Sequence, residues 1–484
     1  MKKILVFIVA VLAVVGVQRA EAQSQSSYFM GGTYFRTDLN PAFAPKRGYV
    51  ALPVLGGVDV DVSNNFLSVN NFVFERDGGL VTAFHSSVSS EEFLKKMPNR
   101  GRLAMNVKSN ILGVGFYVGN LYFNLGLNAN VSTDASMSMD IFKAVKQLGN
   151  GIYDLGNTAF NANAYMDAYV GTSIRILRNL RVGARAKLLV GIANFGGDFN
   201  KLQVNVDPNV VNGVMSGQWR ANGIFIDNSM VRAGSELPLN EVMRTDLGYI
   251  FSNFKNYGLA FDLGAEMCFL DNHLRVSAAV TDLGFIRWGK KSHIGGIIDG
   301  EFNYSGMNIE TSEIEANYDY ELLVTDGSET QGYTSMLNCS LNIGAEYNIL
   351  NDRIGFGLLS HTTFYNTMSY SELTASVNFR PLRWLSATVS HTFLNRNRAG
   401  IFGFALNLYT SGINFYVGMD YIDLCWVKGP TIGSMKPSLP RYAKSLNAYM
   451  GVGFSFGGAK DMYSDSGVKS KKAKKSKRGS EAED

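Results

Sequence analysis

The side chains that could do chemistry are few, and a glycine-containing stretch is the first to consider. Gly284–Lys291 reads GFIRWGKK, one residue away from the phosphate-binding loop of nucleotide-binding proteins. In that loop a Ser or Thr hydroxyl reaches Mg²⁺, but Lys291 occupies the position here, and the stretch leaves a strand for a loop and opens no helix. The sequence therefore disfavours a nucleotide site.

Two serine–histidine neighbours, Ser360–His361 and Ser390–His391, suggest a hydrolase, because a serine nucleophile needs its base within hydrogen-bond reach. Adjacent residues of a strand point to opposite faces, so these neighbours cannot meet if they lie on strands. We therefore interpret them as polar residues near one rim of the fold and predict no catalytic residue.

The other reactive side chains show no site spacing. The histidines His85, His273 and His293 are not spaced as metal ligands. Three cysteines cannot all pair, so no disulfide framework is predicted. We expect neither a metal nor a cofactor, and the absence of a basic stripe gives no indication of nucleic-acid binding.

The clearest structural pattern is a hairpin at 257–289. Apolar residues recur at every second position from Tyr257 to Phe269, with Asp262 and Glu266 between them, and the return arm alternates again after Asp271. One face is apolar and rich in aromatic rings, and the other is small and charged. Strands of ~10 residues or more with this alternation are typical of a transmembrane β-barrel.

The same period of two predicts fourteen arms, at 48–62, 103–118, 121–133, 158–177, 180–195, 257–270, 273–288, 334–350, 353–366, 369–381, 383–395, 400–410, 412–424 and 444–457. The connections after even-numbered arms are all tight, and five of the seven that follow odd-numbered arms are long. Outer-membrane barrels have short periplasmic turns and long external loops, so we predict an all-β antiparallel barrel with both termini in the periplasm. Capping signals at Ser89 and Asp140 predict helices in two long loops.

Charged residues recur on the expected inner face of neighbouring arms. They are Arg181, Arg185, Lys187, Asp262, Glu266, Arg275, Glu346 and Arg353. Two interpretations are open for these lumen-lining candidates. They can form a ladder of ion pairs along a wet lumen, or they can select a solute.

The ends of the chain differ from its middle. Residues 1–22 resemble a secretory signal peptide with an Ala-Glu-Ala cleavage site, so the barrel is expected in the cell outer membrane. Residues 23–47 form a structured non-strand segment, residues 48–457 the barrel, and residues 458–484 a basic tail with too little apolar content to fold.

The segment at 23–47 is a candidate plug. Its aromatic residues must bury somewhere, and the only large unfilled space nearby is the lumen. Asn40–Pro41 is the predicted hinge, since proline disfavours the helical region for the residue before it. The candidate plug and hinge residues are Tyr34, Phe35, Arg36, Asn40, Pro41 and Phe43. A periplasmic cap beneath the rim is the alternative position.

The stretches FRTDLNPAF at 35–43, LPVLGG at 52–57 and VTDLGFIRW at 280–288 resemble an uncharacterised family of Bacteroidota outer-membrane barrels. More distantly the chain is similar to FadL-type long-chain fatty-acid transporters. That resemblance implies fourteen strands, an Asn-Pro-Ala motif matched here by Asn40-Pro41-Ala42, and an N-terminal hatch. The basic tail departs from that pattern.

Two functions follow from these expectations. One is a FadL-like channel for small hydrophobic or amphipathic molecules, because a barrel of this size leaves a lumen that side chains alone do not fill. The alternative is a non-transporting scaffold or secretion-system barrel that binds protein partners. Expected partners are outer-membrane lipid and lipopolysaccharide, a small hydrophobic ligand, and a periplasmic protein or peptidoglycan reached through the basic tail.

Overall fold

The protein is described by a computed structural model that covers nine stretches of the chain. They are residues 24–76, 79–147, 151–206, 211–232, 242–308, 313–324, 331–393, 401–428 and 438–458. The expected signal peptide and nearly all of the basic tail lie outside these described residues.

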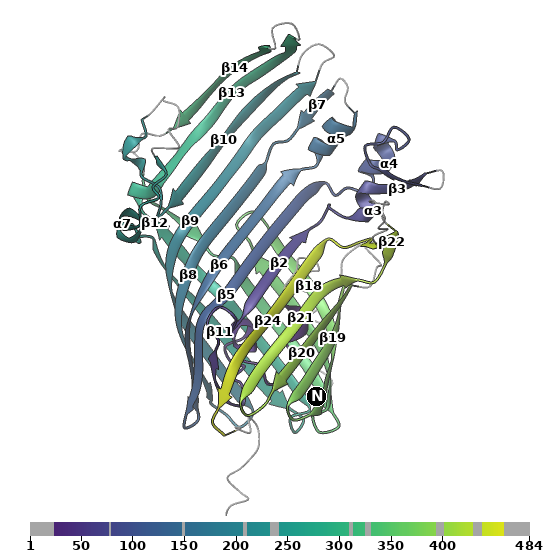
Figure 1. Ribbon diagram of the computed structural model, residues 1–484. Coiled ribbons are helices and arrows are strands. Elements are labelled where there is room, and N and C mark those ends of the chain that lie inside the picture. Colours follow the sequence, from purple (N-terminus) through teal and green to yellow (C-terminus); the bar gives the residue numbers. More distant parts are fainter. Residues whose placement is uncertain are drawn as a thin grey trace, which may run out of the picture.

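The strands close into an antiparallel barrel of 14 strands, as the alternation predicts (Figure 1). The first wall position is shared by β1 (Gly48–Ala51) and β2 (Val58–Asn64), and both pair with β24 (Ser445–Phe456), which closes the ring. The other wall strands are β5 (Arg100–Val118), β6 (Leu121–Ser138), β8 (Thr158–Arg175), β9 (Leu180–Val206), β11 (Tyr257–Phe269), β12 (Leu274–Trp288), β15 and β16 (Tyr333–Met336 and Cys339–Ile349), β17 (Ile354–Phe364), β18 (Ser369–Leu382), β19 (Leu385–Phe393), β20 (Ile401–Tyr409) and β21 (Ile413–Asp423).

The first arm is interrupted, although the sequence pattern predicts one arm at 48–62. Between β1 and β2 the chain leaves the sheet at 52–57, and Val54 adopts a left-handed φ of 65°. Pro53 cannot donate a ladder hydrogen bond, and the Gly56–Gly57 pair allows a sharp bend. The six residues at 52–57 therefore bulge out opposite only two residues of β24, Gly451 and Val452.

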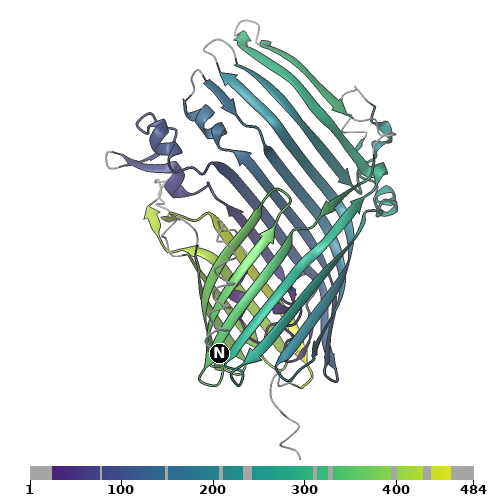
Figure 2. The ribbon, with the colours of Figure 1, turned by 180° about the vertical axis from the view of Figure 1, so that it is seen from behind.

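The barrel has a short-turn end and a long-loop end, and the wall is much higher on one side of the long-loop end (Figures 1 and 2). β9 is 27 residues long, whereas β19 has 9. The upper part of β9 pairs with β10 (Val211–Gly223), which pairs with β13 (His293–Asn308), and β13 pairs with β14 (Glu313–Val324). β7 (Gly151–Asp154) also pairs with β9. A membrane strand needs ~9–11 residues, so this raised sheet extends well beyond any membrane.

Small elements surround the long-loop end. They are α3 (Val69–Phe72), β3 (Val73–Arg76), β4 (Gly79–Thr82), α4 (Ser90–Leu94), α5 (Asp140–Gln147), η2 (Asn228–Met230), α7 (Leu247–Ser252), η3 (Lys290–Ser292), β22 (Trp426–Lys428) and β23 (Ser438–Pro440). Both predicted loop helices are confirmed: Ser89 caps α4 by accepting a hydrogen bond from Glu92 N, and α5 begins at Asp140.

The wall has two chemically different faces. On β11, Phe261 is 51% exposed and points away from the lumen, while its neighbours Ala260 and Asp262 are fully buried. Aromatic and aliphatic side chains cover the outer face of the other strands in the same way, for example at Phe356, Phe379 and Phe404. Among the described residues, no helix has the length and apolar content to cross a membrane.

Candidate functional site: the barrel lumen

Inward-facing charges on β9, β11 and β12 form one connected network. Lys187 Nζ lies 2.8 Å from Asp262 Oδ1 and 2.6 Å from Asp282 Oδ1. Arg185 Nη1 lies 3.7 Å from Asp262 Oδ2. Arg185, Lys187 and Asp262 are buried, and a buried charge is tolerated only when it is paired. Three of the eight predicted lumen residues are therefore brought together here.

A second charge group lies nearer the short-turn end. Glu346 on β16 pairs with Arg380 on β18 and lies 3.7 Å from Arg275 Nη1 on β12. Arg275 also pairs with Asp352 at 2.7 Å. Glu266 and Arg181 are buried on the inner face as well.

Arg353 does not belong to this group, contrary to the sequence expectation. It lies in the turn that precedes β17, which begins at Ile354, and its side chain is exposed. The turn takes three left-handed residues, from Leu350 to Asp352, so the chain reaches the strand one position later than simple alternation predicts.

Several members of the two groups were missed at the sequence level, namely Lys108, Asp282 and Arg380. Asp282 lies at a β-bulge opposite Phe261–Leu263 and has a φ of 58°. A bulge inserts one residue, so Val280 and Leu283 both face outward and the count of inner positions shifts. Lys108 and Arg380 lie on the expected inner face of their arms, and the alternation alone could have found them.

The N-terminal residues from Ser24 to Pro45 lie within the ring of strands and contain η1 (Gln25–Ser27) and α2 (Arg36–Leu39). Wall side chains donate to their backbone carbonyls from several directions. Arg380 reaches Phe29 O at 2.7 Å, Asn407 reaches Gly31 O at 3.0 Å, and Asn342 reaches Leu39 O at 3.0 Å. Asp420 accepts from Ser26 N and Oγ.

The aromatic residues of this segment are buried as a group against wall rings. Tyr34 stacks on Tyr49 with ring centroids 4.1 Å apart. Phe35 stacks on Tyr416 at 5.1 Å and on Tyr449 at 5.5 Å. Phe43 is also buried, with the Arg36 guanidinium 4.0 Å above its ring.

Asp38 connects the segment to the charge network. Its two oxygens lie 2.7 Å from Arg185 Nη1 and 2.8 Å from Lys108 Nζ. Burial by itself would raise the pKa of Asp38, but the charges of Lys108 and Arg185 outweigh it and hold the pKa well below its usual range. The carboxylate is therefore ionised at neutral pH and fixed between two cations. The sequence also suggested Glu266 and Arg275 as partners for Arg36 and Asp38, but no ion pair to either is found among the described residues.

Asn40 and Pro41 have the local geometry that the sequence predicts. α2 ends at Leu39, and Asn40 is extended with φ −156° and ψ 113°. Asn40 Oδ1 accepts from Ala42 N at 2.9 Å, which turns the chain. The backbone here approaches the wall so closely that a Cβ on Gly183 would lie 2.3 Å from Pro41, so glycine is required at that position.

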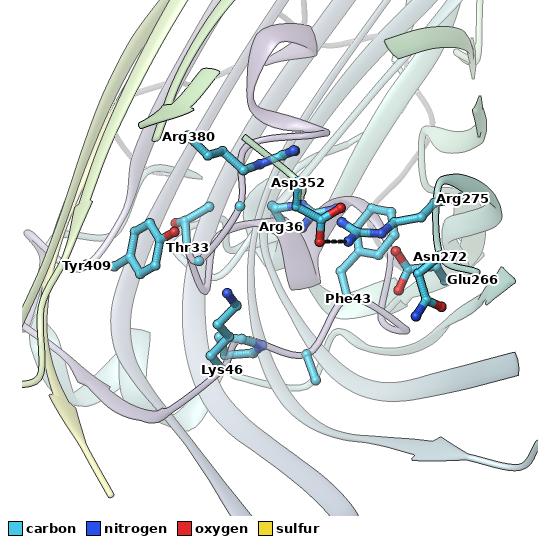
Figure 3. Close-up of a pocket in the computed structure, with 14 residues that line it drawn as sticks. Thr33, Arg36, Phe43, Lys46, Glu266, Asn272, Arg275, Asp352, Arg380 and Tyr409 are labelled. Carbon is cyan, nitrogen blue, oxygen red and sulfur yellow. Dashed lines mark hydrogen bonds and ion pairs between the residues drawn. The ribbon is translucent and has the colours of Figure 1, made fainter. Parts of the chain in front are cut away.

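Two polar cavities flank the segment. The inner cavity, toward the short-turn end, has a volume of about 300 Å³ (Figure 3). Its charged lining comprises Arg36, Lys46, Arg275, Arg380, Glu266 and Asp352. The outer cavity, toward the long-loop end, has about 140 Å³ and is lined by carboxylates, amides and tyrosines, including Asp59, Asp61, Lys108, Asn106, Tyr165 and Tyr365.

Arg36 is one of the cations that line the inner cavity. Its Nε donates to Tyr28 O at 2.7 Å, but no carboxylate among the described residues lies within 4.0 Å of its guanidinium. Burial lowers the pKa of Arg36 from its usual value. Figure 3 shows the side chain among the residues that line the inner cavity, and its guanidinium lies over the Phe43 ring.

No arrangement for catalysis or metal binding emerges from the described residues. No three His, Cys, Asp or Glu side chains there are grouped as metal ligands. His361 is buried and bonds Asn342 Oδ1 at 2.6 Å and Thr363 Oγ1 at 2.8 Å, so both ring nitrogens are engaged.

The chain belongs to a protein family of unknown function, DUF5723, whose model matches residues 41–420. No curated protein matches. Among solved structures, the Ralstonia pickettii toluene transporter TbuX is similar at a TM-score of 0.40 with 10% identity, over 90% of this chain and 99% of that one. A Pseudomonas aeruginosa FadL homologue follows at 0.38 with 10% identity over 91% and 99%, and the CymD monoaromatic hydrocarbon channel at 0.39 with 10% identity over 92% and 99%. Scores and identities this low are distant likenesses.

Proposed function

We propose that this protein is an outer-membrane channel whose lumen is closed by its own N-terminal segment, residues 24–45. The membrane part of the proposal is supported by the outward apolar face of the wall and by the contrast between a short-turn end and a long-loop end. A fully exposed belt of this size is disfavoured in a water-soluble protein. The long-loop end then faces the exterior, and both termini of the barrel face the periplasm.

The position of the membrane can be tested on the wall itself. Phe261→Arg would place a charge on the lipid-facing side near mid-strand, and we expect it to destabilise the barrel by ~2–4 kcal/mol. The matched control is Asn130→Arg, because Asn130 lines the outer cavity and a charge there meets water. Urea unfolding in lipid vesicles measures both, and equal losses in the two variants would contradict the membrane assignment.

The observation that carries the channel proposal is the set of contacts around residues 24–45. Strands on all sides of the ring bond to this segment, from Arg185 on β9 to Asn342 on β16 and Asn407 on β20. A barrel of fourteen strands is wider than the eight-stranded barrels that side chains can fill. The segment therefore occupies space that would otherwise conduct.

The cavities indicate what a solute would meet. Carboxylates, amides and cationic side chains line both of them, together with rings such as Phe43 and Tyr165. A purely hydrophobic molecule would leave these polar groups without partners, which costs free energy. Small amphipathic molecules fit the lining better. Of the two solute classes that the sequence suggested, hydrophobic molecules are therefore the less favoured.

Solute uptake into proteoliposomes tests this choice. Vesicles that contain the protein with Ser27–Phe43 deleted should admit small polar and amphipathic solutes faster than vesicles with the intact chain. Hydrophobic solutes cross lipid unaided, so a radiolabelled aromatic hydrocarbon should show no difference between the two. Identical uptake of polar solutes by both proteins would contradict the channel proposal.

One feature favours the alternative of a non-transporting scaffold. The raised sheet of β9, β10, β13 and β14 extends far above the rim, where a protein partner could pair with it. A scaffold has no need of an openable lumen. The intact chain of a scaffold would therefore show no solute uptake under any condition.

A further inference from the structure

The outer ends of β11 and β12 carry an abrupt change from apolar to cationic side chains. Toward the long-loop end, the outward residues Leu259 and Tyr257 of β11 give way to Lys255, which lies two residues before the strand begins. On the outward face of β12, Leu283 and Phe285 are followed by Arg287. Tyr257 and Arg287 are direct partners across the ladder, so both changes occur at the same height. Lys290 and Lys291 follow within one turn, and both are exposed.

A short helix lies beside these cations with its apolar face uncovered. α7 projects sideways from the rim in both views (Figures 1 and 2). Leu247 is 68% exposed and Phe251 is 69% exposed, and residues four apart lie on the same side of a helix. Phe254 lies against Phe251 with ring centroids 6.0 Å apart. Nothing among the described residues buries this face.

The helix and the cations belong to one framework. Gly289 N donates to Asn256 Oδ1 at 2.8 Å, which fixes the segment of Lys290 beside Lys255. Tyr249 of α7 donates to Ile226 O at 2.8 Å, and Asn228 donates to Lys290 O at 2.7 Å, so the loop at 226–228 holds both parts. The arrangement is therefore preformed.

Three cations of this region, Lys255, Arg287 and Lys291, are available for an external anion. Among the described residues, no carboxylate lies within 4.0 Å of Lys255, Arg287 or Lys291. Two acids of the adjoining described loops are already engaged: Asp227 pairs with Arg244 at 2.9 Å, and Asp246 caps α7 by accepting from Tyr249 N at 2.7 Å.

We propose that Lys255, Arg287, Lys290 and Lys291, with the apolar face of α7, form a binding site for the phosphate groups of lipopolysaccharide in the outer leaflet. We call these residues the rim patch. Long cationic side chains at the edge of an apolar belt extend toward headgroups, and an amphipathic helix beside them inserts its apolar face among acyl chains. The assignment to lipopolysaccharide rests on the proposed orientation, in which the long-loop end faces the outer leaflet.

Lipid retention in zwitterionic nanodiscs tests the rim patch directly. The intact chain and the variant Lys255→Gln/Arg287→Gln/Lys291→Gln are reconstituted, titrated with purified lipopolysaccharide, and analysed by native mass spectrometry. Each Lys or Arg near an anionic surface adds to the binding affinity, and losing three of them should weaken lipopolysaccharide binding about 100-fold. A variant with the same charge loss elsewhere, Lys95→Gln/Lys143→Gln/Arg383→Gln, should bind like the intact chain.

The outcomes separate this site from the proposed function. Failure of the intact chain to insert into nanodiscs would contradict the membrane assignment. Normal insertion with unchanged lipopolysaccharide binding in the rim-patch variant would overturn the site alone. Equal affinity of the intact chain for phosphatidylglycerol would overturn the choice of lipopolysaccharide.

The apolar half of the rim patch has its own variant. Leu247→Ser/Phe251→Ser keeps every cation but removes the inserted side chains. Lipopolysaccharide binding should weaken by about tenfold, because acyl-chain contacts are lost while phosphate contacts stay. Binding at the level of the intact chain would show that α7 takes no part.

Discussion

The N-terminal segment is held by ion pairs on one side of the lumen and by ring stacking and hydrogen bonds on the other. Toward β5 and β9, Asp38 bonds Lys108 and Arg185. Toward β20, β21 and β24, wall amides reach its carbonyls and Phe35 stacks between tyrosines. Breaking a buried ion pair leaves a charge buried without a partner, which is strongly destabilising. Losing a neutral hydrogen bond costs only about 1 kcal/mol. The two sides should therefore respond very differently to small changes.

The largest single-residue effect is expected on the aromatic side. Phe35→Ala removes a buried ring that stacks on Tyr416 and Tyr449, and large-to-small changes of this kind cost ~3–5 kcal/mol. Hydrogen exchange of the amides at 30–44 measures the free energy of local opening, which should fall by that amount. Phe356→Ala is the control, since its ring faces outward and exchange in the segment should not change. Unchanged protection in Phe35→Ala would contradict the packing described.

The second-largest effect is expected on the charged side of the lumen, from Asp38→Asn. The change keeps the shape of the side chain but leaves Lys108 and Arg185 without their carboxylate partner in the segment, and we expect a loss of ~2–3 kcal/mol in local opening. Exchange should accelerate most around α2 and less around Gly31, which the opposite wall holds. A uniform acceleration over the whole segment would show that the two sides do not act separately.

The smallest effect is expected from Asn407→Ala. Its amide donates one neutral hydrogen bond to Gly31 O, and the loss should be about 1 kcal/mol, confined to amides near Gly31. Asn366→Ala, on the long-loop side, should leave the segment unaffected. A loss as large as that of Asp38→Asn would remove the contrast between the two sides.

The sequence predicts the wall better than the lumen because alternation is a local property. A period of two places Phe261 outside and Asp262 inside with no knowledge of neighbours, and the tight turns then identify the barrel. It misses the break at 52–57 and the bulge at Asp282, because both change the count of residues within a strand. Arg353 was misplaced because the turn before β17 runs one residue further than the alternation predicts.

The contacts of the N-terminal segment depend instead on closure of the ring. Asp38 and Lys108 lie seventy positions apart, and they meet only because β5 and β9 are brought around the same lumen. The aromatic content predicts that residues 28–45 are buried, and Asn40–Pro41 predicts the turn. Neither the aromatic content nor the Asn40–Pro41 motif predicts which wall residues contact the segment, since that requires the register of all the strands.

Single-channel recording in planar bilayers tests the central claim, that residues 24–45 close the lumen. The intact chain and the variant lacking Ser27–Phe43 are compared after circular dichroism and heat-modifiable gel mobility show that both are folded barrels. The account predicts a silent or rarely open intact protein and a large, steady conductance in the deletion variant. A folded deletion variant whose trace matches that of the intact chain would contradict it.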